Sequence, residues 1–240
     1  MIEISTGLML VAFAAVLCAS VVQTAMGFGF ALILAPVLML INPALVPAPI
    51  LIIAFAQAVA SAWIHRADVQ WKRIMMAIIG RLPGTLLAMA LMVWLGPVAL
   101  NYFVAAGVLF AVVMSIFHFS VEPTERNHFI AGFISGVAGT SSGIAGPPMA
   151  LLYQHQTGDV VRANLSVYFA LGSLISLAGM GSIGYVTVQS WFYAALFIPA
   201  TGLGFWLGLK VKHLLKASFM RPAILVLCSI SALMVLLSAF

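Results

Sequence analysis

The sequence predicts an all-α polytopic membrane protein. Hydrophobic residues make up 64% of the 240 residues and charged residues only 6%, which is too apolar for the surface of a soluble domain. Apolar runs of about 20 residues, enough for a helix to cross a hydrocarbon layer of about 30 Å, recur along the chain. The apolar and polar alternation of a transmembrane β-barrel is missing. Since backbone groups in lipid must be hydrogen-bonded within their own segment, the spans are expected to be helices.

Glycines, prolines and charged residues divide the chain into apolar segments. In chain order these are 6–24, 28–41, 45–64, 71–95, 99–118, 127–140, 145–156, 160–181, 188–209 and 217–239. The first has no basic residue ahead of it and leads directly into further apolar sequence, so we interpret it as a retained membrane segment rather than a signal peptide. Segments 28–41 and 145–156 are too short to cross the bilayer at about 1.5 Å per residue, so they are predicted to be half-helices.

The basic residues set the orientation of these segments. Connections at 42–44, 96–98 and 182–187 carry no positive charge. The other connections carry Arg66, Lys72, Arg73, Arg126, Arg162, Lys210, Lys212, Lys216 and Arg221. The positive-inside rule places the basic connections in the cytoplasm and both termini outside. The chain is then cytoplasmic near 126 and again near 157, so the segments between them must form a hairpin, and the same reasoning applies to 6–41.

The two halves of the chain are predicted to be inverted repeats. Residues 116 positions apart include the pairs Thr24 and Thr140, Gly27 and Gly143, Pro83 and Pro199, and Thr85 and Thr201. The copies cover 1–118 and 119–240 within one integral membrane domain, and they cross the membrane in opposite directions. Inverted repeats with broken helices are typical of secondary transporters, which hold substrate near the midplane where the breaks meet.

The break in the second half, GTSSGIAGPPMALL at 139–152, has the composition of an anion site. Backbone N–H groups exposed at membrane depth are costly unless a ligand binds them. Hydroxyl donors come from Thr140, Ser141 and Ser142, and the glycines, including Gly143 and Gly146, permit close backbone approach. The two prolines fit a first helical turn, whose positive dipole end would face the anion.

The break in the first half, QTAMGFGF at 23–30, is less polar, which predicts an asymmetric site. It supplies Gln23, Thr24, Gly27 and Gly29. The glycines of both breaks also suit close helix packing, which is the alternative interpretation. Gln57 and its repeat partner Ser173 are polar residues within apolar segments, and each suits either a ligand contact or a hydrogen bond between helices.

Arg81 is the basic residue placed deepest in an apolar segment. It lies eight positions after Arg73, which is about 12 Å along a helix and near the middle of the hydrocarbon layer. A charge at this depth indicates a functional site by default. The alternatives are an arginine that extends to the surface or one that pairs with a carbonyl freed by Pro83. Its repeat partner is Phe197, so the two halves contribute one buried cation.

The remaining polar residues exclude several other functions. All five carboxylates lie at segment ends or in connections, so no Asp or Glu is placed to carry a coupling proton or to bind sodium. Cys18 and Cys228 have no spacing typical of a disulfide framework or a metal site. We expect no cofactor, no metal and no nucleic-acid partner. The expected partners are a small anion and the lipid bilayer.

The two glycine-rich breaks, QTAMGFGFALILAP and GTSSGIAGPPMALL, resemble those of the TauE/SafE family of membrane anion exporters. The resemblance covers nearly the whole chain, although the first copy lacks the Ser pair and the Pro pair. It implies an inner-membrane transporter that exports sulfite or an organosulfonate such as sulfoacetate.

Two alternatives remain at the level of sequence. One is a channel or carrier for another small inorganic or organic anion. The other is an intramembrane serine protease, because Gly139, Ser141 and Gly143 match G-x-S-x-G. The histidines all lie near segment ends, away from Ser141, so we predict that the chain is not an enzyme.

Overall fold

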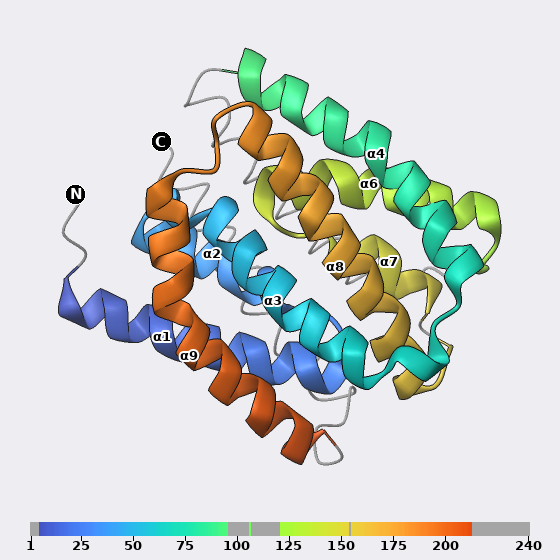
Figure 1. Ribbon diagram of the computed structural model, residues 1–240, viewed down its shortest axis with the longest axis horizontal. Helices are drawn as coiled ribbons and strands as arrows, with labels where there is room; N and C mark the ends of the chain where they lie inside the picture. Colours follow the sequence, from blue (N-terminus) through green and yellow to red (C-terminus); the bar gives the residue numbers. More distant parts are fainter. Residues whose placement is uncertain (1–4, 96–105, 107–120, 154, 213–240) are drawn as a thin grey trace.

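In the computed structural model, residues 5–95, 106, 121–153 and 155–212 are described, and their regular structure is helical throughout (Figure 1). The prediction of an all-α fold is confirmed for these residues. The predicted segments 99–118 and 217–239 lie outside them, except for residue 106.

The described helices match the predicted segments closely. The first half contains α1 (Thr6–Met26), α2 (Phe30–Ile41), α3 (Ala48–Ile64) and α4 (Trp71–Trp94), with short 3-10 turns at Pro43–Leu45 and Arg66–Asp68. The second half contains α6 (Glu125–Ser142), α7 (Gly146–Leu152), α8 (Gly158–Ser182) and α9 (Val188–Val211). At the predicted offset, each first-half helix overlaps its counterpart in the second half.

Among the described residues, five helical segments are long and apolar enough to cross a membrane. They are Thr6–Met26, Pro43–Ile64, Trp71–Trp94, Gly158–Ser182 and Val188–Val211. With 12 and 7 residues, α2 and α7 extend only about 18 Å and about 10 Å, so they are shorter than the hydrocarbon layer. The chain is therefore a multi-pass membrane protein.

The tryptophans are distributed as expected for a protein in a bilayer. All five are between 50% and 85% exposed, and most lie close to a helix end. They are Trp63, Trp71, Trp94, Trp191 and Trp206. Tryptophan favours the membrane interface because its ring is apolar and its N–H is polar. Arg66 and Lys210 stack on Trp63 and Trp206, respectively, so these rings also accompany basic residues.

The helices α1 and α6 end in the same way. Gly27 follows α1 with φ 87°, and Gly143 follows α6 with φ 81°. Each glycine donates its N–H to the carbonyl four residues earlier, that of Gln23 or Gly139. This left-handed conformation strains any residue with a Cβ, which explains why both breaks contain glycine at this position.

The main helix contacts join the two halves. In Figure 1, α4 packs on α6, α1 on α9, and α3 on α8. The first helix of each half thus packs against the last described helix of the other half, which is the pairing that the predicted repeat leads us to expect. The opposite direction of the two copies across a membrane stays a prediction.

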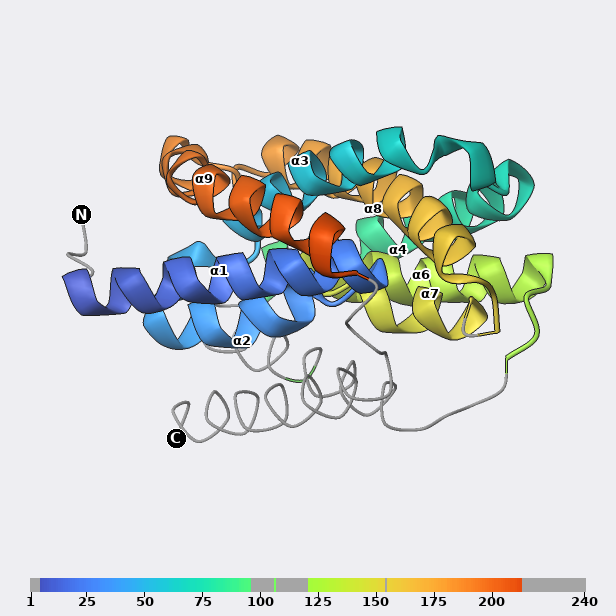
Figure 2. The same ribbon diagram turned by 90° about the horizontal axis from the view of Figure 1, so that it is seen from below.

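The α1–α2 and α6–α7 hairpins extend toward each other from opposite ends of the molecule (Figure 2). Their bends are in contact. A Cβ built on Gly146 would lie 3.8 Å from the Cβ of Phe28, and one built on Gly143 would lie 4.0 Å from that of Ala31. The helix breaks, far apart in sequence, therefore meet in the interior.

Candidate functional site

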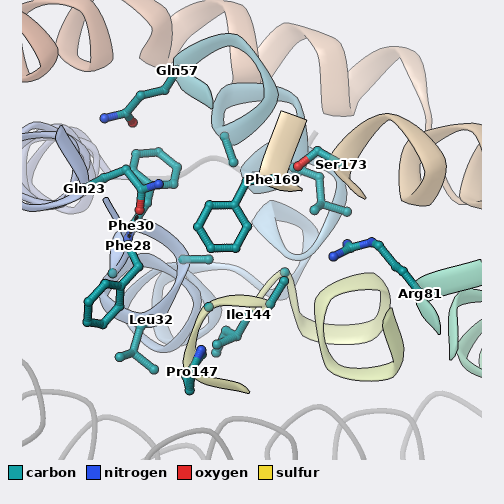
Figure 3. A pocket seen from close by; sticks show the side chains of 17 residues that line it. Gln23, Phe28, Phe30, Leu32, Gln57, Arg81, Ile144, Pro147, Phe169 and Ser173 are labelled. Atoms are coloured by element: carbon teal, nitrogen blue, oxygen red, sulfur yellow. Dashed lines mark hydrogen bonds between the residues drawn. The ribbon is translucent and has the colours of Figure 1, made fainter. Parts of the chain in front are cut away.

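A small cavity of about 40 Å³ lies where the two bends meet (Figure 3). Its walls come from both hairpins and from α3, α4 and α8. Seven of the predicted site residues line it: Gln23, Gly29, Gln57, Arg81, Gly143, Gly146 and Ser173. Phe28, Phe30 and Phe169 make much of the remaining wall apolar.

Arg81 from α4 supplies a cation to this wall. The residue is only 1% exposed, so its side chain does not extend to the surface. Its Nη1 donates to the Tyr168 hydroxyl at 3.2 Å, and its Nη2 donates to Ser176 Oγ at 3.0 Å. The guanidinium carbon lies 5.3 Å from the centre of the Tyr168 ring. Its Nε has no hydrogen-bond partner among the described residues.

The partners of Arg81 lie on one face of α8. Tyr168, Gly172 and Ser176 are spaced four residues apart, so they follow one another along that face. A Cβ on Gly172 would lie 2.6 Å from the guanidinium carbon, which means that the α8 backbone packs directly against the guanidinium. We call these three residues the α8 cradle. Our sequence reasoning missed it, although the four-residue spacing of Tyr, Gly and Ser in a helix opposite a buried arginine was a readable signal.

The α8 cradle is electrically neutral. The ion pairs among the described residues are Lys72–Glu125 and Arg162–Asp159, and all four side chains lie close to helix starts. The hydrogen bond and the charge of Lys72 lower the pKa of Glu125. In the described part of the chain, no carboxylate pairs with Arg81. A buried charge without a counter-ion is costly, so this wall favours an anion.

The hydroxyls of the second break are occupied within the protein. Thr140 Oγ1 is 2.8 Å from Ser176 Oγ and donates to Thr85 Oγ1, so it supports the α8 cradle. Ser141 donates to the carbonyl of Val137 at 2.8 Å. Ser142 donates to the carbonyl of Ala138 and accepts from the N–H of Ile144. None of the three lies among the residues that form the cavity wall.

The first turn of α7 offers fewer donors than we expected. Pro147 and Pro148 have no N–H groups, so two amides are missing from the turn that begins at Gly146. Arg81 is the positively charged residue among those that line the cavity.

In the first break, Gln23 stabilises the bend. Its amide donates to the carbonyl of Gly27 at 3.3 Å and accepts from the N–H of Phe30 at 3.1 Å. Gly29 lies on the cavity wall, whereas Thr24 and Gly27 do not. A Cβ on Gly27 would lie 3.2 Å from the Cα of Arg162, so this glycine faces α8 rather than the cavity.

Gln57 connects α3 with α1 and also faces the cavity. Its Nε2 donates to the carbonyl of Ser20 at 2.9 Å and to Thr24 Oγ1 at 3.0 Å. Its Oε1 accepts no hydrogen bond from any residue that the structure describes. Ser173 lies on the wall near Arg81, as Figure 3 shows.

The comparison with known families agrees with this architecture. The model of the family described as "Sulfite exporter TauE/SafE" matches residues 12–235, nearly the whole chain. No curated protein and no solved structure matches the chain. The members of the matched family are membrane transporters. The chain belongs to the sulfite exporter TauE/SafE family.

Proposed function

We propose that the protein exports sulfite or an organosulfonate such as sulfoacetate across the bacterial inner membrane. The substrate binds in the cavity between the two hairpin bends. The family supports the substrate class and the outward direction. The buried charge of Arg81 supports an anion, and the apolar remainder of the wall favours a small one.

The observation that carries the proposal is the incomplete pairing of Arg81. A guanidinium has five N–H groups, and the α8 cradle accepts hydrogen bonds from two of them. We assign the others to the oxygens of an oxyanion, whose geometry matches the planar guanidinium fork. The substrate thus supplies the negative charge that balances Arg81.

The contact between the hairpins supports a transport mechanism. The hairpins of an inverted repeat approach the cavity from opposite membrane faces, so each is placed to control access from one side. The first helix of each half packs on the last described helix of the other half, α1 on α9 and α6 on α4. Two halves related in this way favour two arrangements of the protein with similar energy. In each arrangement the cavity is open to one side of the membrane.

The test is a binding titration on purified protein with sulfite, sulfoacetate, sulfate and chloride. We expect the sulfur anions of the proposed class to bind most tightly. Arg81→Ala should lower their affinity at least about tenfold, since removing a buried charge contact typically costs about 2 to 5 kcal/mol. Arg81→Lys should restore only part of it, because an ammonium lacks the planar fork.

Arg66→Ala is the control, because Arg66 is exposed at the end of α3 and stacks on Trp63 away from the cavity. It should bind like the unmodified protein. Arg81→Ala protein that folds and binds sulfur anions normally would refute the proposed site.

A further inference from the structure

We infer that the cavity selects a sulfur oxyanion that carries a hydrogen-bond donor, with hydrogen sulfite as the simplest case, and that Gln57 makes this selection. The inference deepens the proposed function and rests on it. Its basis is an unpartnered amide oxygen on the cavity wall.

The orientation of the Gln57 amide is fixed by its neighbours. The carbonyl of Ser20, 2.9 Å away, can only accept a hydrogen bond, so the group facing it must be the NH₂. Thr24 Oγ1 donates its own hydrogen to the same carbonyl at 2.8 Å, so it faces Gln57 with a lone pair. A flipped amide would place its oxygen against two acceptors. The Oε1 must therefore point the other way.

The Oε1 of Gln57 is buried and has no partner in the described part of the chain. The residue is 3% exposed and lines the cavity, and in Figure 3 its oxygen lies toward the cavity interior. Gln23, on the same wall, differs because both ends of its amide are occupied by the backbone of the first break. A buried acceptor without a donor is unfavourable, so a ligand that supplies an O–H gains an interaction that other ligands cannot make.

The cavity thus presents two different demands to an anion. On the α4 wall, Arg81 attracts negative oxygens, and on the α3 wall, Gln57 accepts a hydrogen. Hydrogen sulfite meets both demands, because it has one negative charge and one hydroxyl. Fully ionised sulfite has acceptors only, so it would leave the Gln57 oxygen unpaired, and its second charge would face a wall that is largely apolar.

The test uses two anions that differ only in the donor. Methanesulfinate has a methyl group where hydrogen sulfite has a hydroxyl, and it carries the same charge. At mildly acidic pH, where hydrogen sulfite predominates, the unmodified protein should bind hydrogen sulfite at least about fivefold more tightly than methanesulfinate, since an unsatisfied buried acceptor costs about 1 to 3 kcal/mol. Equal affinities would overturn the inference.

Gln57→Met tests whether this residue is responsible. Methionine has a similar length but neither donates nor accepts strongly, so the preference for hydrogen sulfite should disappear. Gln189→Met, at an exposed position of α9, is the matched control and should keep the preference. A preference that survives in Gln57→Met protein would assign the selection to another group.

The outcomes also separate the two proposals. If the unmodified protein binds neither of these anions nor sulfoacetate, the proposed function fails and the inference fails with it. If it binds both anions equally, only the selection by Gln57 is refuted. If the Gln57→Met protein fails to fold, the comparison of the two anions on the unmodified protein still tests whether the cavity prefers an anion with a hydrogen-bond donor.

Discussion

Arg81 and Arg162 show how differently two arginines of this chain are used. Arg162 has Asp159 as a partner and also donates to the carbonyl of Ala25, so its charge is balanced near the start of α8. Arg81 has only neutral partners in the described residues. A carboxylate beside Arg81 would compete with an anionic substrate, so the neutral α8 cradle fixes the guanidinium without neutralising it.

Gly172→Ala should weaken anion binding by displacing the guanidinium. The added Cβ would lie 2.6 Å from the guanidinium carbon, so the Arg81 side chain must shift. We expect a loss of about fivefold or more in affinity, given that overpacking typically costs about 1 to 3 kcal/mol. Gly181→Ala is the control, because it lies in the same helix with no atom within 4 Å of its added Cβ. Affinities of both variants for sulfite can be measured by titration.

A double-mutant cycle separates this effect from a general packing defect. In Arg81→Lys protein the guanidinium is absent, so adding Gly172→Ala should cost much less than it does in the unmodified protein. Effects that simply add would show that Gly172 acts through helix packing rather than through Arg81.

At the scale of elements, glycines determine how closely α4 and α6 approach. A Cβ on Gly132 would collide with the carbonyl of Ala77, and one on Gly80 would collide with the carbonyl of Phe129. Each glycine thus lies against the backbone of the other helix, as in membrane helix pairs with small residues at their interface. This contact matters for the site because α4 carries Arg81 and α6 leads into the second break.

Gly132→Ala should therefore destabilise the protein by separating these helices. We expect a loss of about 1 to 3 kcal/mol, because the collision is with backbone atoms that cannot rotate away. Thermal unfolding in detergent would measure it as a lower Tm. Gly202→Ala in α9 has nothing within 4 Å of its Cβ and should unfold like the unmodified protein. Equal Tm values for the two variants would contradict the close α4–α6 contact.

At the scale of the whole molecule, the first helix of each half packs on the last described helix of the other half. From this pairing we predict an inverted topology. If the halves cross the membrane in opposite directions, the connections after α3 and α9 lie in the cytoplasm, whereas the connection after α8 lies outside. Asp68, Lys212 and Ser182 are exposed in or next to these connections.

Cysteines introduced at Asp68 and Lys212 should react with a membrane-impermeant reagent only from the cytoplasmic side. A cysteine at Ser182 should react only from outside. These variants need a background without native thiols, with Cys18 and Cys228 replaced by serine or alanine. Labelling of Asp68 and Lys212 from opposite sides would exclude the inverted repeat.

The sequence by itself determined the described helical segments, the glycines that end α1 and α6, and the position of Arg81 inside an apolar helix. These features depend on local properties: the length of an apolar run, the left-handed conformation that favours Gly27 and Gly143, and the rise of a helix. The family resemblance was likewise readable from the two breaks and was confirmed over residues 12–235.

Only the tertiary structure decided which polar groups face the cavity. Ser141 and Ser142 have the composition of an anion site, but their hydroxyls bond carbonyls of their own helix, as serines in helices commonly do. The partners of Arg81 on α8 lie 87 and 95 residues away in sequence. The free oxygen of Gln57 depends on the carbonyl of Ser20, 37 residues earlier. Hydrogen bonds between distant segments set these orientations, and no local pattern encodes them.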